Sequence, residues 1–177
     1  MIQFLFLGLV LVGAMAVAKV AAGTAPLTTV PKVDLKRYTG RWYEIAKFAN
    51  RFERQCDRDV TATYDIRPDG KISVVNACYT KEGKLSQSTG WAKVADAQTF
   101  SKLKVTFFWP FFGDYWIIDL GANYEYAVIG EPGRKYLWIL SRTAQMDDKV
   151  YAEIAARLAA QGYDASRLER MKQTGHD

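Results

Sequence analysis

The stretch from Gly40 to Ala46 reads GRWYEIA and marks the place where the chain enters its first strand. Glycine reaches backbone conformations that are closed to other residues, so Gly40 can turn the chain sharply at this point. Trp42 supplies one large ring near the start of the strand, where it can close the end of a sheet that curls on itself. The first strand is therefore predicted at residues 41–47.

Seven more strands follow, separated by turns. Residues 59–66 alternate between polar and apolar side chains, as expected for a strand with one buried face. The next residues, Arg67 to Gly70, place Pro and Gly where a tight reversal requires them. The other strands are predicted at residues 71–78, 86–94, 102–108, 115–120, 126–130 and 136–142. Short strands joined by short turns predict an antiparallel barrel or sandwich, and eight strands can close into a barrel with room for one small ligand.

The hydrophobic period changes after the strands. Between Asp147 and Gln161 apolar residues recur at helical spacing, with Asp147 placed to cap the start and Gly162 to end the helix. A single helix after eight strands is expected to lie against the outer wall of a barrel. A short helical turn is also predicted before the first strand, from the capping residue Asp34 to Tyr38.

The 177-residue chain is long enough for one domain with a substantial core, and its nine Phe, ten Tyr and five Trp residues argue against disorder. Residues 2–18 are almost entirely apolar and uncharged, and small residues follow, which predicts a secretory signal peptide cut after Ala18 or Ala22. A transmembrane anchor, the alternative, needs about 20 apolar residues. We therefore expect a signal peptide at residues 1–22, a linker at 23–32 and one domain at 33–177.

Two cysteines and one histidine limit the chemistry. Export to an oxidising compartment predicts that Cys56 and Cys78 form one disulfide. Neither cysteine lies directly after the apolar run at residues 2–18, so we expect no lipid-anchor site. His176, the only histidine, lies one residue from the C-terminus, which argues against a histidine-based catalytic triad or zinc site. We therefore expect no catalytic residue, no metal and no cofactor.

The formal net charge of +5 comes from scattered Lys and Arg residues without a basic run. This pattern is typical of a solvated basic surface, and we expect no nucleic acid as a partner. A mild attraction to anionic lipid headgroups is the alternative interpretation.

Three motifs, in this order, resemble those of the lipocalin family. Residues 40–46 resemble its Gly-x-Trp motif, and residues 123–126 (NYEY) resemble the second motif, with Ala122-Asn123 where Thr-Asp is usual. Arg142 resembles the third motif. Residues 51–54, 61–64, 107–113 and 136–143 are similar to bacterial outer-membrane and apolipoprotein D-like lipocalins, and the resemblance spans residues 33–175. It implies an all-β fold with a C-terminal α-helix: an eight-stranded antiparallel up-and-down β-barrel.

The motif residues Gly40, Trp42, Tyr124 and Arg142 are expected to have a structural role. Arg142 ends the last strand, where its guanidinium can lie over the Trp42 ring. Such a cation–π contact contributes about 1 kcal/mol or more when it is shielded from water. We expect these residues to close the barrel floor rather than to bind a ligand.

If the first strand starts at the floor, every second connection lies at the open mouth. These connections are residues 48–57, 79–85, 108–114 and 130–135. A Cys56–Cys78 disulfide there would pin the first connection to the wall and contribute about 3 kcal/mol in the chain-entropy model.

An exposed aromatic rim for contact with a ligand, membrane or partner is predicted at Phe108, Trp109, Phe111 and Phe112. The alternative is that these rings fold inward and pack.

The inward faces of the strands are expected to form an apolar and aromatic site with a few hydroxyl groups. The candidate ligand-binding residues are Ala62, Tyr64, Val74, Asn76, Val105, Phe107, Tyr115, Ile117, Tyr126, Val128 and Trp138, the last matching a pocket tryptophan of apolipoprotein D-like proteins. Cations at the rim can meet a phosphate or carboxylate: Arg51, Arg54, Arg58 and Lys81. Glu44 shares the inward parity of Trp42, and a buried carboxylate must be paired or neutral.

The resemblance implies that the protein binds and carries or stores a hydrophobic ligand, a lysophospholipid or long-chain fatty acid, in support of membrane maintenance. The alternatives are another hydrophobic cargo, such as a tetrapyrrole or a steroid-like molecule, and an isomerase that uses a free pocket thiol. A partner-binding role with a filled barrel is a further alternative. We expect a monomer or homodimer, exported to the periplasm or attached to the outer membrane, that contacts the membrane surface through the aromatic rim.

Overall fold

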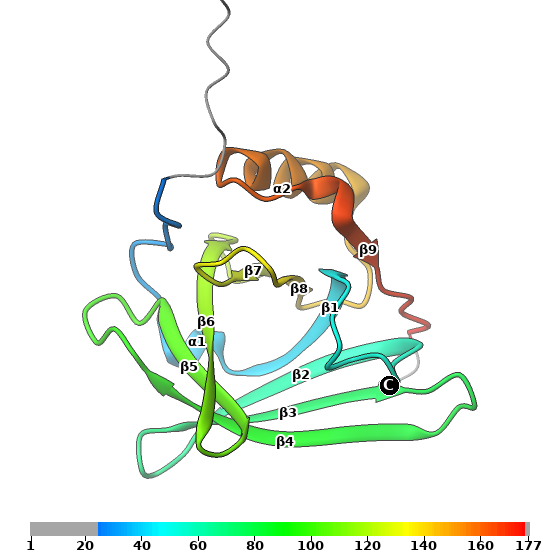
Figure 1. Cartoon of the computed structure of the whole chain (residues 1–177), viewed down its shortest axis with the longest axis horizontal. Coiled ribbons are helices and arrows are strands. Elements are labelled where there is room, and N and C mark those ends of the chain that lie inside the picture. Colours follow the sequence, from blue (N-terminus) through cyan, green and yellow to red (C-terminus); the bar gives the residue numbers. More distant parts are fainter. Residues whose placement is uncertain (1–24, 176–177) are drawn as a thin grey trace, which may run out of the picture.

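The computed structural model describes residues 25–175, so the predicted signal peptide at 1–22 lies outside the described residues. Antiparallel strands form a closed barrel, because β1 pairs with β8 on one side and with β2 on the other. The strands are β1 (Gly40–Phe48), β2 (Arg58–Ile66), β3 (Ile72–Tyr79), β4 (Leu85–Val94), β5 (Lys102–Phe108), β6 (Phe111–Leu120), β7 (Tyr126–Gly130) and β8 (Leu137–Ser141). Figure 1 shows helix α2 (Asp148–Ala160) on one side of the barrel. The predicted fold class is confirmed.

The predicted strands agree closely with the observed ones except at two places. β6 begins at Phe111, which pairs with Phe108, so the predicted loop at 108–114 is a tight hairpin around Trp109 and Pro110. A further short strand, β9 (Leu168–Arg170), follows a 3₁₀ turn, η1 (Ala165–Arg167), and pairs with the mouth end of β1. Three residues are too few to show an alternation of polar and apolar side chains, so β9 was not predicted from the sequence.

The floor of the barrel is closed by the predicted motif residues. A φ of +93° at Gly40 turns the chain from α1 (Leu35–Tyr38) into β1. The Arg142 guanidinium lies 3.7 Å from the centroid of the fully buried Trp42 ring and donates hydrogen bonds to three backbone carbonyls of the α1–β1 segment. The Tyr124 hydroxyl accepts a hydrogen bond from the amide of Asp34, the N-cap of α1, at 2.8 Å. These contacts tie three separate segments together under the barrel.

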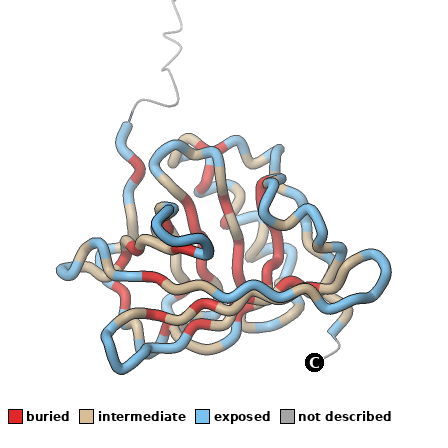
Figure 2. The backbone as a smooth tube through the Cα atoms, turned by 60° about the horizontal axis from the view of Figure 1, so that its bottom comes forward, coloured by how far each residue is buried: buried red, intermediate tan, exposed pale blue. Residues whose placement is uncertain are grey.

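The two faces of the wall pack into separate cores, and Figure 2 shows the buried positions along the strands. The interior core surrounds Trp42 and receives residues from each of the eight barrel strands. The outer core lies under α2, where Ile154 and Leu158 are buried in the same cluster as Val128. The predicted cap of α2 is confirmed, because Asp147 accepts hydrogen bonds from two amides of the first turn. Among residues 25–175, no helix is long and apolar enough to cross a membrane.

The part of the predicted linker that the structure describes packs against the barrel. The Val30 amide donates a hydrogen bond to the Ile117 carbonyl at 3.0 Å, and Leu27 is buried in the outer core. The Ser101 hydroxyl donates to the Thr29 hydroxyl at 2.9 Å. Residues 25–32 are therefore held against the barrel by hydrogen bonds and apolar packing.

The opposite end of the barrel is the mouth, and the predicted disulfide is confirmed there. Cys56 and Cys78 are bonded, with their Cα atoms 5.5 Å apart. The bond fixes to β3 the first connection, residues 49–57, which we call the lid segment. The lid segment also contains a turn in which the Cys56 amide donates to the Glu53 carbonyl at 2.9 Å. It therefore has a defined path from the end of β1 to the start of β2.

Candidate ligand-binding site

Most of the predicted lining residues face the barrel interior. The interior core contains Ala62, Tyr64, Val74, Tyr115 and Ile117, and two more, Val105 and Trp138, pack against it. Asn76 pairs with Ala62 and lies on the same face. The Phe107 ring lies against Gly90, which pairs with Val74 and so also faces inward.

The prediction is wrong for Tyr126 and Val128, which face outward. Val128 is fully buried in the outer core, and the Tyr126 hydroxyl accepts a hydrogen bond from Arg157 of α2 at 3.0 Å. Their neighbours Ala127 and Ile129 belong to the interior core instead. Because all three residues from Ala127 to Ile129 are fully buried, apolar character could not tell the two faces of β7 apart.

Three tyrosine hydroxyls form a hydrogen-bonded chain inside the barrel. The hydroxyl oxygens of Tyr38 and Tyr115 lie 2.6 Å apart, and the Tyr115 hydroxyl donates to the Tyr64 hydroxyl at 3.0 Å. Burial raises the pKa of Tyr64 to about 12 and also raises the pKa values of Tyr38 and Tyr115. This part of the interior therefore presents neutral hydroxyl groups that satisfy one another.

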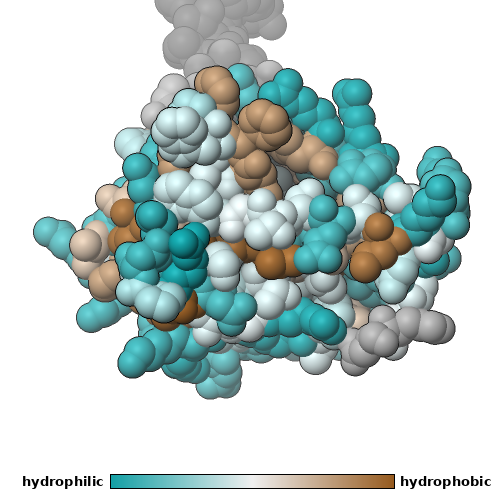
Figure 3. All heavy atoms as spheres, turned by 90° about the horizontal axis from the view of Figure 1, so that it is seen from below, coloured by the Kyte–Doolittle hydropathy of each residue, from teal (hydrophilic) through white to brown (hydrophobic). Residues whose placement is uncertain are grey.

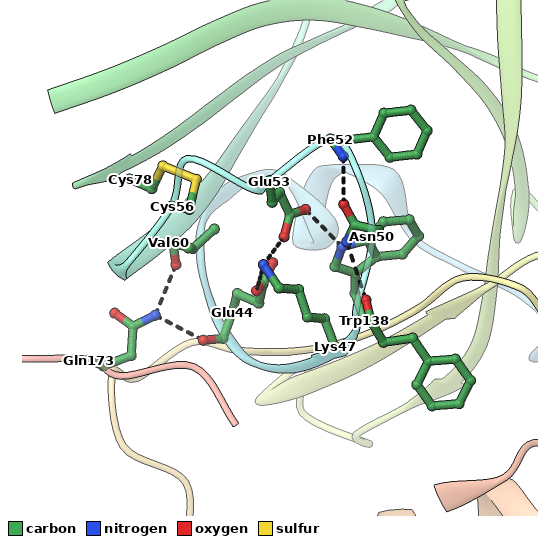
Figure 4. A network of polar contacts seen from close by, with 11 residues as sticks. Glu44, Lys47, Asn50, Phe52, Glu53, Cys56, Val60, Cys78, Trp138 and Gln173 are labelled. Carbon is green, nitrogen blue, oxygen red and sulfur yellow. Dashed lines mark hydrogen bonds and ion pairs between the residues drawn. A yellow bond between two sulfur atoms is a disulfide. The ribbon is translucent and has the colours of Figure 1, made fainter. Parts of the chain in front are cut away.

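A charged cluster lies nearer the mouth (Figure 4). The pairing of β1 with β8 shifts register between Glu44 and Ala46, and this bulge puts Glu44 and Lys47 on the same, inward face. The Lys47 ammonium lies 3.4 Å from a Glu44 carboxylate oxygen and forms an ion pair with Glu53 of the lid segment. Trp138 Nε1 donates a hydrogen bond to Glu53 at 3.0 Å. The cluster thus joins β1, β8 and the lid segment.

The sequence predicted that Glu44, if buried, must be paired or neutral, and the structure shows its burial and its partner. Glu44 is 3% exposed and Lys47 is 7% exposed. Burial and the nearby Glu53 carboxylate hold the pKa of Glu44 well above its usual range. Burial lowers the pKa of Lys47, but the Glu44 and Glu53 carboxylates outweigh burial and raise that pKa above its usual value. Glu44 therefore keeps its proton to a higher pH than an ordinary glutamate.

Sequence reasoning missed Lys47 and Glu53. Strict alternation from Trp42 puts Lys47 on the outer face, and nothing in the sequence marks the bulge that reverses this assignment. Glu53 lies in a connection without hydrophobic period. The one available signal was the inward parity of Glu44, because a buried carboxylate calls for a cation or a proton nearby.

Exposed aromatic residues lie at one side of the mouth. At the tip of the β5–β6 hairpin Phe108, Trp109 and Phe111 are 81%, 74% and 75% exposed. Phe112, predicted with them, instead packs edge-on against Trp91, with ring centroids 5.1 Å apart. Figure 3 shows how hydrophobic residues gather in patches among hydrophilic ones on one face of the molecule. Three of the four predicted rim residues are therefore exposed, and Phe112 is packed.

The predicted rim cations have different surroundings. Arg51 and Arg54 are exposed in the lid segment, and Lys81 is exposed in the turn between β3 and β4. Arg58 lies 3.7 and 3.6 Å from the carboxylates of its two neighbouring aspartates. Arg58 is therefore less available to an anionic ligand than the other three.

A family comparison agrees with this architecture. Residues 33–173 match the family model described as a lipocalin-like domain. The chain belongs to the lipocalin family. Over 150 residues this lipocalin is 45% identical to the outer membrane lipoprotein Blc of Escherichia coli (strain K12), covering 84% of each chain. It is 41% identical over 156 residues to temperature-induced lipocalin-1 of Arabidopsis thaliana, covering 84% of this chain and 83% of the relative.

Solved structures share the fold of this lipocalin. Insecticyanin from the tobacco hornworm Manduca sexta matches with a TM-score of 0.64 at 21% identity, over 84% of this chain and 85% of that one. At this identity the likeness concerns the fold alone. The family and the relatives support binding of a hydrophobic ligand, and members of the family are typically binding proteins rather than enzymes.

Proposed function

We propose that this lipocalin binds and carries a lysophospholipid or long-chain fatty acid in its barrel, in support of membrane maintenance. The observation that carries the proposal is an apolar and aromatic interior face that continues to the mouth, where the inward-facing Phe107 is 41% exposed. An acyl chain gains about 0.8 kcal/mol for each CH₂ that leaves water. That the relative Blc is named an outer membrane lipoprotein supports a place in the cell envelope.

The wall near Phe107 also offers a polar contact. The Asn76 side-chain oxygen is buried and has no hydrogen-bond partner among the described residues. A buried acceptor without a donor costs free energy, so a ligand hydroxyl that donates to Asn76 would be favoured. A lysophospholipid carries such a hydroxyl on its glycerol, next to the acyl chain.

The aromatic rim supports loading and unloading at a membrane. Phe108, Trp109 and Phe111 expose most of their surface beside the mouth, and exposed apolar groups of this size usually mark contact with a partner or membrane. The net charge of +5 favours an anionic lipid surface. The rim would bring the mouth to the surface from which a lipid enters.

Displacement of a fluorescent acyl probe tests the proposal, with lysophosphatidylcholine, palmitic acid and haem as competitors. We expect both lipids to displace the probe. Phe107→Ala should weaken lipid binding about tenfold, because it removes an apolar contact inside the mouth. Phe108→Ala is the matched control on the rim and should change binding in solution by less than about twofold.

Failure of both lipids to displace the probe would contradict lipid carriage. Tight binding of haem alone would favour the tetrapyrrole alternative. The isomerase alternative needs a free thiol, whereas the two cysteines of the sequence are bonded to each other. If the isomerase alternative holds, reduction of the disulfide, which frees both thiols, should generate isomerase activity on a lipid substrate, whereas lipid carriage predicts none.

A further inference from the structure

Lys47 is a cation held inside a barrel by a group that is not part of the barrel wall. Its side chain is 8% exposed, and its nearer partner is the Glu53 carboxylate of the lid segment. Glu44, on the wall beside it, is more distant at 3.4 Å, and its Oε1 has no hydrogen bond of good geometry among the described residues. The ion pair that neutralises Lys47 therefore depends on where the lid segment lies.

Two donors converge on the Glu53 carboxylate. One oxygen accepts from Lys47 Nζ and the other accepts from Trp138 Nε1. An ammonium and an indole N–H that meet two oxygens of one acid make a receptor for any carboxylate, and phosphate oxygens suit the same donors. Figure 4 shows the three side chains pointing toward one another below the lid segment.

A pocket at the surface adjoins this receptor. A pocket of about 450 Å³ lies between the lid segment and β9, and both Lys47 and Glu53 are among its lining residues. Three arginines line the same pocket, Arg51, Arg54 and Arg170, together with one acid, Glu169. Arg170 is also paired with Asp148 at 2.8 Å. A cluster of cations around an opening raises the local concentration of anions.

We propose that Lys47 and Trp138 form the binding site for the acidic head of the cargo, and that the Glu53 carboxylate competes with this head for the same two donors. The proposal rests on the proposed function, because it assigns the head group of the same ligand. The favoured ligand is an amphiphile with one carboxylate or phosphate at the end of its chain. Its acid replaces the acid of Glu53, and the lid segment is released.

The exchange is favourable because it leaves the buried charge balance unchanged. Moving Glu53 away without a replacement would leave Lys47, whose side chain is 8% exposed, with the Glu44 carboxyl at 3.4 Å as its remaining acidic partner in a low-dielectric interior, which is unfavourable. An incoming anion takes over the pairing, while Glu53 moves out to water, where a carboxylate is well solvated. A neutral head such as an alcohol cannot neutralise Lys47 and therefore leaves Glu53 in place.

Competition experiments with palmitic acid, cetyl alcohol and palmitoyl lysophosphatidic acid test the proposal by probe displacement. Glu53→Gln removes the internal competitor and should strengthen binding of the two acids about tenfold without changing the alcohol. Lys47→Met should weaken both acids by about tenfold or more and leave the alcohol within about twofold. If only one acid responds, the response separates a carboxylate site from a phosphate site.

Lys47→Met leaves two carboxylates without their cation and can fail to fold. The double variant Lys47→Met/Glu53→Gln restores the balance and should show the same loss of preference for acid over alcohol. Lys47→Arg should retain the preference. Lys104→Met is the surface control, because Lys104 is paired with Asp114 on the outside of the barrel, and it should behave like the wild type.

Amide hydrogen exchange separates a head-group site from a purely structural ion pair. Palmitic acid should accelerate exchange in residues 51–55, whereas cetyl alcohol should not. The proposal is overturned if acid and alcohol affinities shift together in every variant, or if the acid leaves lid exchange unchanged. If neither ligand binds the wild-type protein, lipid carriage itself fails; if both bind equally in all variants, only the head-group site fails.

Discussion

Trp42 and Glu44 lie two positions apart on β1 and point into the same barrel, but burial has different consequences for the two side chains. Trp42 is fully buried, and the only polar atom of its side chain, Nε1, donates a hydrogen bond to the Tyr38 carbonyl at 2.8 Å. Its burial therefore stabilises the fold without leaving a polar group unpaired. Glu44 is almost as buried but brings a carboxyl group, which is stable there as a neutral acid or beside a cation.

Glu44 should make stability fall as the pH rises. A carboxyl group whose pKa is raised in the folded state binds more protons there than in the unfolded chain. The free energy of unfolding should therefore decline from about pH 4.3, the ordinary glutamate value, up to the raised pKa of Glu44, by about 1.4 kcal/mol per unit of pKa difference. Glu44→Gln should remove this decline in urea unfolding measured across the range, and the exposed Glu153→Gln should retain it. An equal decline in both variants would contradict the assignment.

Gly90 should tolerate no side chain. A Cβ atom there would lie 2.3 Å from the Thr106 carbonyl oxygen and 2.8 Å from the Phe107 ring. Gly90→Ala should therefore lower the free energy of unfolding by about 1–3 kcal/mol and displace Phe107 from the wall. At Gly113 a Cβ would meet its nearest neighbours at 4.0 Å, so Gly113→Ala is the matched control and should be neutral or slightly stabilising. Thermal unfolding of the two variants compares them directly, and equal losses would count against the steric argument.

At the scale of elements, β1 connects the floor, the interior and the lid segment. It pairs with β2 at its floor end, with β8 across the bulge and with β9 at its mouth end. The bulge changes which residues face inward partway along the strand. A substitution in β1 is therefore expected to affect the floor or the mouth according to the side of the bulge on which it lies.

Alternation and turn residues were enough to predict the eight barrel strands, because each has a polar or apolar rhythm or a clear boundary. They were not enough to orient β7, where Ala127, Val128 and Ile129 are all fully buried. The part of the site around Tyr64 could be predicted from the alternation of residues along the strand. The charged cluster of Glu44, Lys47 and Glu53 could not. Its geometry depends on a register shift in β1 and on the path of the lid segment, and both are set by tertiary packing.

The disulfide should matter most for the lid segment. The double variant Cys56→Ser/Cys78→Ser removes a covalent link across a sequence separation of 22 residues. In the chain-entropy model this lowers the free energy of unfolding by about 3 kcal/mol, because the unfolded chain gains freedom. Urea unfolding measures the loss, and hydrogen exchange should rise first in residues 49–57. A loss spread evenly over the barrel strands would argue against a local role.

At the scale of the whole molecule, the two ends of the barrel differ in chemistry. The floor is sealed by a buried tryptophan under an arginine, whereas the mouth carries exposed aromatic rings and lid cations. An object with one sealed end and one apolar end has a defined orientation at a surface. We expect the mouth to face a membrane when the protein is bound to one.

Vesicle sedimentation tests this orientation. Replacing Phe108, Trp109 and Phe111 together by Ser should reduce partition onto anionic vesicles by about tenfold or more, because three exposed apolar rings no longer enter the interface. Ile66→Ser, at the floor end where Ile66 is 45% exposed, is the matched control and should leave partition unchanged. Affinity for a lipid in solution should stay the same in both. Unchanged partition of the triple variant would rule out the rim as the contact.

Lys47 lies five residues after Trp42 on the same strand, and this spacing fixes the distance between the buried ammonium and the barrel floor. A strand rises about 3.3 Å per residue, and the bulge removes one of the five steps, so Trp42, which seals the floor, lies roughly 13 Å along the wall from the residue that carries the buried ammonium. An acid held at Lys47 can extend its chain straight only until it meets the floor. A longer chain must fold back on itself or leave its end in the mouth. The distance along β1 would then limit the length of the cargo that can lie straight in the barrel. A residue inserted between Trp42 and Lys47 would change that limit.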